Sequence, residues 1–173
     1  MMNSSKATIY VVDDDLSVRR GLSRLLRSTG YIVETFGSSE EFLQNFSDCL
    51  SPACLILDVK MPGLSGLDLQ NQLQQMEYVM PIVFITAHGD IPMSVKAMKK
   101  GAVDFLVKPF DEKDLLKAVQ VALKKNILYR RAMNEKQRIL QRVKLLTPRE
   151  YEILTYVISG SLNKQTAYEL NIT

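Results

Sequence analysis

Residues 10–18 read YVVDDDLSV, an apolar run that ends in three consecutive carboxylates. Three neighbouring carboxylates repel one another, and a solvated charge cluster is the simplest explanation of such a triplet. This triplet, however, directly follows the run 9–12 (IYVV), whose aromatic and β-branched residues are typical of a buried strand. Carboxylates crowded at the end of a strand commonly bind a cation or take part in the binding or transfer of a phosphate group. Asp13, Asp14 and Asp15 are therefore candidate site residues.

The composition indicates a globular protein with room for one ordinary domain and a small second one. The chain has 173 residues, of which 46% are hydrophobic and 24% are charged. Its apolar runs are too short to span a membrane, and no secretory signal is visible at residues 1–6. Cys49 and Cys54 lack zinc-finger spacing and are expected to be reduced thiols in the cytoplasm. A single histidine, His88, argues against a histidine-based metal site or a Ser-His-Asp hydrolase.

The charge is unevenly distributed along the chain. Residues 1–124 contain 13 basic and 15 acidic side chains, whereas residues 125–173 contain 9 basic and 4 acidic ones. The acidic part suits a cation site, and the basic part suits a polyanionic partner such as nucleic acid.

The acidic part of the chain alternates short β-branched runs with longer helical patterns. The predicted strands are 8–12, 32–35, 54–57, 82–85 and 103–107. The predicted helices are 17–28, 39–46, 65–75, 91–100 and a fifth that begins near Asp111 and continues at least to Lys124. Gly30 and Gly101 lie where two of these helices end, and Ser39 and Asp111 are predicted N-terminal caps. This alternation predicts an α/β domain with a doubly wound, five-stranded parallel sheet.

Polar residues follow four of the five predicted strands. In a doubly wound sheet, ligands bind and reactive side chains lie just outside the carboxyl ends of the strands. The first strand is followed by the aspartate triplet, the third by Asp58, the fourth by Thr86 and the fifth by Lys108. The second is followed by Phe36-Gly37, which carries no reactive group and suits a strand at the edge of the sheet. The polar side chains are therefore expected to converge on one pocket.

Such a set of side chains suits phosphoryl transfer. Mg²⁺ prefers oxygen ligands and keeps several waters, so two or three acidic side chains are enough to bind it. Asp58 is then a candidate nucleophile, because carboxylates can form acyl phosphates. The Lys108 ammonium and the Thr86 hydroxyl can stabilise the oxygens of the transferred group.

Four segments carry a resemblance to a known family. They are VVDDD (11–15), LILDVKMPGLSG (55–66), VFITAHGD (83–90) and DFLVKPF (104–110). In this order and spacing they resemble the receiver domain of two-component response regulators, of the FixJ-like kind that joins a receiver to a LuxR-type DNA-binding module. The resemblance implies a flavodoxin-like receiver domain at residues 7–124 and a cytoplasmic protein.

The resemblance also implies a role for each site residue. Asp58 would accept a phosphoryl group from a sensor histidine kinase. Asp14 and Asp58 would bind Mg²⁺ directly, together with the Lys60 backbone carbonyl, and Asp13 would act mainly through water. Thr86 and Phe105 would form a switch pair, and Lys108 would be the cation that senses the phosphate. The Lys108-Pro109 peptide bond would be cis. Phosphorylation would change the surface of the fourth helix and fifth strand and so favour a homodimer.

The basic end of the chain is predicted to be helical. Residues 125–144 are charged, contain no Gly or Pro, and are expected to form a helical linker. Residues 145–173 resemble the N-terminal part of an all-α LuxR-type helix-turn-helix domain, with a capped helix from Thr147-Pro148-Arg149-Glu150 and a second helix at 164–170. The recognition helix of that family is absent from the sequence. Promoter DNA is therefore the expected partner of a full-length form, with weak or no binding by this chain, and Lys164 is a candidate contact to a DNA phosphate.

Two other functions fit parts of this pattern. One is a phosphatase of the haloacid-dehalogenase type, in which Asp13 would be the nucleophile and Asp13-x-Asp15 its motif. That interpretation leaves Asp58 and the following Met61-Pro62-Gly63 turn unexplained. The other is a receiver that acts only through protein–protein contacts, because the DNA-reading helix is missing.

Overall fold

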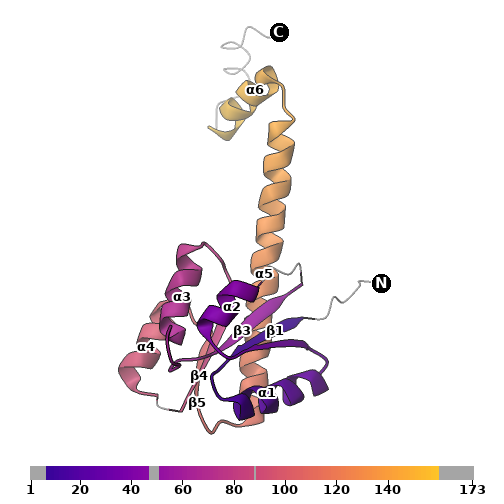
Figure 1. The fold of residues 1–173 in the computed structure, drawn as a ribbon. Coiled ribbons are helices and arrows are strands. Elements are labelled where there is room, and N and C mark those ends of the chain that lie inside the picture. The colour runs from indigo at the N-terminus through magenta and orange to yellow at the C-terminus, as the bar shows by residue number, and fades with distance from the viewer. Residues whose placement is uncertain (1–6, 47–50, 88, 160–173) are drawn as a thin grey trace. The chain divides into compact units, whose positions relative to one another are not determined.

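The structure is a computed structural model that describes residues 7–46, 51–87 and 89–159. Strands and helices alternate along its first part (Figure 1). The strands are β1 (Thr8–Val12), β2 (Ile32–Phe36), β3 (Ala53–Asp58), β4 (Ile82–Thr86) and β5 (Asp104–Val107). The helices are α1 (Leu16–Ser28), α2 (Ser39–Asn45), α3 (Gly66–Gln75), α4 (Ile91–Lys99), α5 (Glu112–Lys144) and α6 (Pro148–Ile158). The chain divides into two compact units, Met1–Tyr129 and Arg130–Thr173.

The five strands form one parallel sheet in the order β2-β1-β3-β4-β5. This order confirms the predicted doubly wound α/β fold, and β2 is an edge strand as expected. Because β1 and β3 are neighbours, with Val12 opposite Leu57, the residues that follow β1 lie beside the last residue of β3. The reversal of strand order between β1 and β3 is the place where such sheets bind ligands.

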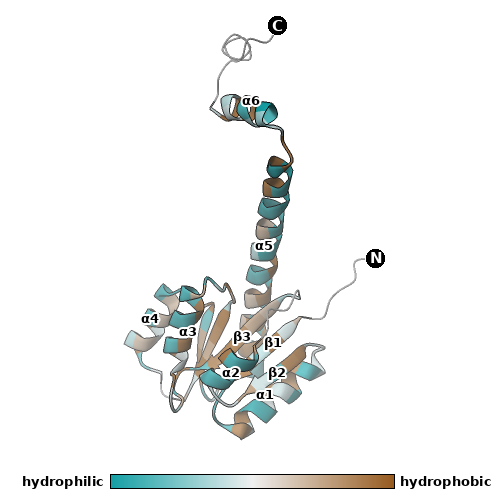
Figure 2. Cartoon of the chain, turned by 45° about the horizontal axis from the view of Figure 1, so that its top comes forward, coloured by the Kyte–Doolittle hydropathy of each residue, from teal (hydrophilic) through white to brown (hydrophobic). Residues whose placement is uncertain are grey.

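Each face of the sheet is covered by helices, and the central strands β1, β3 and β4 are buried on both sides. On one face, α2, α3 and α4 contribute Phe42, Leu69, Leu73 and Ala97 to a core with alternate strand residues. On the other face, α1 and α5 contribute Leu22, Leu26, Leu115 and Val119. This two-sided burial explains why the strands are almost continuously apolar in sequence (Figure 2).

Capping residues set where the helices begin and end. Gly30 and Gly101 have φ values of 94° and 88°, which confirms that a left-handed residue follows α1 and α4. The predicted cap of α2 was wrong by one residue: Ser38 accepts the Glu41 N–H, and Ser39 is buried inside the first turn. Asp15 caps α1 by accepting N–H bonds from the helix's first turn, so α1 begins at Leu16.

Helix α5 is continuous over 33 residues and packs on the sheet through its first half. Its buried residues extend to Asn126, whose Oδ1 accepts the Ala53 N–H at the start of β3, with a distance of 3.1 Å. The bond anchors α5 to the sheet beyond Lys124, the residue to which the sequence predicted that this helix extends at least. Residues 131–142 of α5 are exposed and predominantly hydrophilic (Figure 2).

Helix α6 begins with the predicted capping box. Thr147 and Glu150 exchange side-chain-to-backbone hydrogen bonds, and Pro148 occupies the first helical turn. The predicted helix at 164–170 lies outside the described residues, together with Lys164, Cys49 and His88. Within the part of the chain that the structure describes, no helix combines the length and the apolar character needed to cross a bilayer.

Candidate functional site

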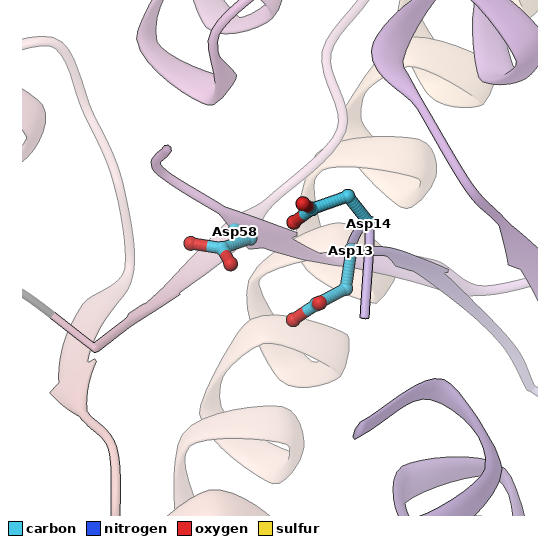
Figure 3. A group of neighbouring side chains, drawn as sticks. All are labelled: Asp13, Asp14 and Asp58. Carbon is cyan, nitrogen blue, oxygen red and sulfur yellow. The ribbon is translucent and has the colours of Figure 1, made fainter. Parts of the chain in front are cut away.

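Three carboxylates meet at the carboxyl edge of the sheet. Asp13 and Asp14 follow β1, Asp58 is the last residue of β3, and one oxygen from each lies within 4.8 Å of the other two (Figure 3). Asp13 is fully buried and Asp58 is 6% exposed, whereas Asp14 is open to solvent. This set of hard oxygen donors, closed on one side and open on the other, can bind a divalent cation that retains part of its water shell.

Lys108 bridges two of these carboxylates from the opposite side of the site. Its Nζ lies 2.6 Å from Asp13 Oδ2 and 3.0 Å from Asp58 Oδ2. Its backbone N–H donates to the Thr86 carbonyl at 2.7 Å, which fixes the start of the side chain just after β5. The Lys108-Pro109 bond is cis, as the resemblance implied. The Lys108 ammonium therefore lies at the carboxyl ends of β1, β3 and β5, where the charged side chains that follow or end these strands meet.

Burial and pairing act in opposite directions on the acid and the base. Burial raises the pKa of Asp13 above its ordinary value, and the hydrogen bonds from Lys108 and from the Asp15 N–H offset this only in part. For Lys108, burial lowers the pKa, but the hydrogen bonds to Asp13 and Asp58 outweigh it and leave the pKa raised. Lys108 thus stays an ammonium, whose charge balances the buried carboxylates.

The aspartate triplet divides into two roles. Asp13 is held at both its carbonyl and its side chain: the Arg19 guanidinium donates to its carbonyl at 2.5 Å, and the Asp15 N–H donates to Asp13 Oδ1 at 2.9 Å. Asp15 instead accepts the Ser17 N–H at 2.7 Å, and such backbone hydrogen bonds lower its pKa. Asp13 and Asp14 therefore belong to the site, and Asp15 starts α1.

Asp58 is oriented through both of its carboxylate oxygens. Oδ1 accepts the Lys60 N–H at 3.2 Å, and Oδ2 faces Lys108. The chain returns at once to start α3, with the Gly66 N–H donating to the Val59 carbonyl at 3.0 Å. A Cβ on Gly66 would lie 2.1 Å from the Asp58 carbonyl oxygen, so only glycine allows this approach. Lys60 is exposed beside Asp58.

Thr86 and Phe105 lie on the adjacent strands β4 and β5, near the cluster formed by the three carboxylates and Lys108. Thr86 ends β4 and is buried, and Phe105 is a half-buried residue of β5 whose ring centre is 6.2 Å from that of Phe84. Gly89, which follows β4, passes close to both: a Cβ there would lie 3.1 Å from Phe105 Cε1 and 3.4 Å from Thr86 Cγ2. The sequence motif contained Gly89, but nothing in its spacing indicated this steric role.

The site residues named from the sequence thus fall into two groups. Asp13, Asp14, Asp58 and Lys108 form one cluster of three carboxylates and an ammonium; Thr86 lies on β4, the strand beside Asp58, and Phe105 lies on β5, the strand beyond it. Lys164, the candidate DNA contact, lies outside the described residues. The cluster can bind a hard cation and present a carboxylate nucleophile to an electrophile that carries negative charge.

Comparison with known proteins gives matches along the whole chain. The model of the response regulator receiver domain matches residues 9–120, and that of bacterial regulatory proteins of the luxR family matches residues 144–173. Nodulation protein W of Bradyrhizobium diazoefficiens is 47% identical over 98% of this chain and 74% of its own length. The transcriptional regulatory protein FixJ of the same organism is 38% identical over 98% of this chain and 82% of its own length. The low-resolution structure of the response regulator StyR superposes with a TM-score of 0.86, at 49% identity over 98% of this chain and 85% of that one.

These comparisons set the phosphatase interpretation aside. The match to the receiver model covers the strands that carry Asp13 and Asp58. The structure agrees, because Asp15, the second acid of the phosphatase motif, caps α1 and is outside the carboxylate cluster found among the described residues. Asp58, which that interpretation left unexplained, lies inside the cluster.

Replacing Lys108 with methionine should destabilise the fold in a pH-dependent way. Because the pKa of Asp13 is already raised by burial, ionising it costs stability as the pH rises, and loss of the ammonium enlarges that cost. We expect Lys108→Met to lose about 2 kcal/mol of unfolding free energy near pH 8 and less near pH 5, because protonation of Asp13, which removes the unpaired buried charge, becomes more favourable as the pH falls. Urea titrations in EDTA at both pH values measure this difference. Lys117→Met, on the exposed face of α5, is the control, and an equal loss at both pH values would contradict the assignment.

Proposed function

Since the chain belongs to the two-component response regulators, with a receiver domain and a LuxR-type DNA-binding module, we propose that Asp58 accepts a phosphoryl group from a sensor histidine kinase. The receiver would comprise residues 7–124, followed by a helical linker at 125–144 and the LuxR-type part at 145–173. Its working place would be the cytoplasm, where the kinase presents its phosphohistidine.

One observation carries this proposal: the Asp58 carboxylate contacts the Lys108 ammonium and a backbone N–H and also keeps partial access to solvent. Its two oxygens are fixed by Lys60 N–H at 3.2 Å and by Lys108 Nζ at 3.0 Å. Asp13 shares the Lys108 charge but is fully buried, and Asp14 is exposed. Asp58 thus combines orientation, charge compensation and partial access, which a carboxylate nucleophile needs.

In the proposed reaction, an Asp58 oxygen attacks phosphorus and the bond from phosphorus to the donor's leaving group breaks. The leaving group, a kinase imidazole or the acetate of acetyl phosphate, takes the electron pair of that bond. Lys108 would move its ammonium from the Asp58 carboxylate to the new phosphoryl oxygens. The product is an acyl phosphate, and the chain itself would catalyse its formation from a small phosphodonor.

The donor set fits Mg²⁺ as the cation of this site. Asp14 and Asp58, with the Lys60 carbonyl, would bind it directly, and Asp13 would act mainly through water. Bound there, Mg²⁺ would neutralise charge on the attacking carboxylate and on the phosphoryl oxygens. Without it, the Lys108 ammonium pairs with Asp13 and Asp58, so the repulsion among these two carboxylates and Asp14 is only partly balanced.

Phosphorylation would be transmitted through Thr86 and Phe105 to the surface of α4 and β5. The Thr86 hydroxyl would move to the phosphoryl oxygens, and Phe105 would turn into the vacated space. Large apolar side chains are exposed on this surface: Ile91 (79%), Val95 (43%) and Met98 (44%) share one face of α4, and Val107 (48%) lies on edge strand β5. Such a patch suits burial in a homodimer formed on phosphorylation.

The output of the dimer would be control of transcription through promoter DNA, as the luxR-family match supports. The expected weakness of DNA binding by this chain, and the contact from Lys164, stay predictions. Dimerisation, by bringing two LuxR-type modules together, would raise their effective concentration on a two-fold site.

Labelling with acetyl phosphate tests the phosphoacceptor. In Mg²⁺ we expect the wild-type chain to gain one phosphoryl group that maps to Asp58 by peptide mass spectrometry, because that carboxylate is oriented and charge-compensated. EDTA should abolish the labelling. Asp58→Asn should lower the extent of labelling at least about 100-fold, since an amide is not a nucleophile here. Persistent label on the Asp58→Asn chain, or label that is indifferent to EDTA, would exclude the mechanism.

A charge placed in the apolar α4 patch tests the dimer surface. Val95→Asp should leave Asp58 labelling unchanged but weaken dimerisation of the phosphorylated chain by about tenfold or more, because burying an unpaired carboxylate is costly. Light scattering after size-exclusion chromatography measures the change. Val121→Asp, at an equally exposed position of α5, should still dimerise. A phosphorylated Val95→Asp dimer of wild-type affinity would place the interface elsewhere.

A further inference from the structure

The loop between β3 and α3, residues 59–65, carries main-chain groups that act on Asp58. The Lys60 N–H donates to Asp58 Oδ1, and the Lys60 carbonyl belongs to the proposed ligand set of the cation. The ends of the loop are closed by the hydrogen bond from Gly66 N–H to the Val59 carbonyl. The position of the Lys60 backbone therefore depends on what holds the middle of this loop.

The middle of the loop is held by Glu40, an exposed side chain in the first turn of α2. Glu40 Oε1 accepts the Leu64 N–H at 2.8 Å, a bond between residues 24 positions apart. The preceding residue, Gly63, has a φ of 76°, which favours glycine, and a Cβ there would lie 2.6 Å from Glu40 Oε1 and displace that carboxylate. Close contact between carboxylate and loop is thus part of the folded geometry.

The Glu40 carboxylate is a firm anchor. Hydrogen bonds from its own N–H and from the Leu64 N–H lower its pKa, so it is ionised at neutral pH and the bond to Leu64 is charge-assisted. Helix α2 is itself fixed by Phe42, which is fully buried with its ring centre 5.8 Å from Tyr10 and 5.4 Å from Phe36. The hydrogen bond from Leu64 N–H to Glu40 therefore links the loop to a helix whose position is fixed by the core.

We propose that Glu40 is a positioning residue for phosphoryl transfer, because it holds the β3–α3 loop so that the Lys60 backbone meets Asp58 and the cation. Glu40 touches neither the acidic cluster nor Asp58, and acts through Gly63 and Leu64. This inference rests on the proposed function of Asp58. It assigns a role to an acidic side chain that would otherwise be an ordinary charge in the first turn of a helix.

The two roles of Glu40 make different demands on its chemistry. A residue that only stabilises α2 through the helix dipole needs its negative charge, so glutamine would be almost as damaging as alanine. A residue that positions the loop needs an acceptor oxygen at Oε1, which glutamine retains. The comparison of Glu40→Gln with Glu40→Ala therefore separates a positioning residue from a helix-stabilising one.

The test uses the full chain with Mg²⁺ and acetyl phosphate. Glu40→Ala should lower the maximal rate of Asp58 labelling about tenfold and weaken Mg²⁺ binding, measured by calorimetry, because a displaced loop misplaces the Lys60 groups. Glu40→Gln should stay within about threefold of wild type. Gln44→Ala, an exposed change in the last turn of α2, is the control for the helix and should label like wild type.

A double-mutant cycle with Gly63 identifies the path of the effect. Gly63→Ala should also slow labelling, since its methyl group displaces the Glu40 carboxylate, and adding Glu40→Ala to it should slow labelling little further. Fully multiplied effects in the double variant, or wild-type rate and Mg²⁺ affinity in Glu40→Ala, would overturn the inference while Asp58 is still labelled. Absence of labelling in the wild-type chain would instead overturn the proposed function itself.

Discussion

The Lys108 ammonium, shared between the carboxylates of Asp13 and Asp58, is the interaction on which the site depends. The three carboxylates of the cluster come from two strands, and their mutual repulsion opposes the alignment of β1 with β3. One cation from the end of β5, at 2.6 and 3.0 Å from the two buried partners, compensates part of that repulsion. A divalent cation would balance the negative charge that remains and would also neutralise charge on the oxygens of the phosphoryl group. Because the charges of the site are only partly balanced, binding of a cation or phosphorylation of Asp58 would change the electrostatic energy of the site.

The parallel sheet is what brings these charges together. Its two cores fix the strands from both faces, so the residues at the strand ends have little freedom to move apart. Around this rigid edge lie three close approaches at glycines: Gly66 to the Asp58 carbonyl, Gly63 to the Glu40 carboxylate, and Gly89 to Val107 and Phe105. Each allows a loop to approach the site more closely than a side chain would permit. The exposed apolar face of α4 lies after Gly89, so this part of the chain connects the carboxylate site to the surface that we propose as the dimer interface.

Much of this arrangement was predictable from the sequence because it depends on local periodicity and on one topological rule. The five apolar runs specified the sheet, and the rule that strand ends meet at one edge predicted that Asp13, Asp14, Asp58 and Lys108 lie together. The rest depends on contacts between distant residues that leave no local pattern. Glu40 resembles any acidic residue in a first helical turn until Leu64, 24 positions away, is seen to donate to it. Asn126 likewise gave no sign that its side chain accepts the Ala53 N–H, because a single buried amide does not alter the helical pattern. The choice between Ser38 and Ser39 as a cap rested on one residue of register, which adjacent serines cannot distinguish.

The site is tested most directly by a crystal structure of the chain grown with Mg²⁺ and beryllofluoride, which imitates a phosphoryl group on a carboxylate. We expect beryllofluoride on an Asp58 oxygen, the cation against Asp14, Asp58 and the Lys60 carbonyl, and Lys108 Nζ turned to a fluoride. Beryllofluoride on a different carboxylate, or a cation bound away from the three aspartates, would contradict this assignment.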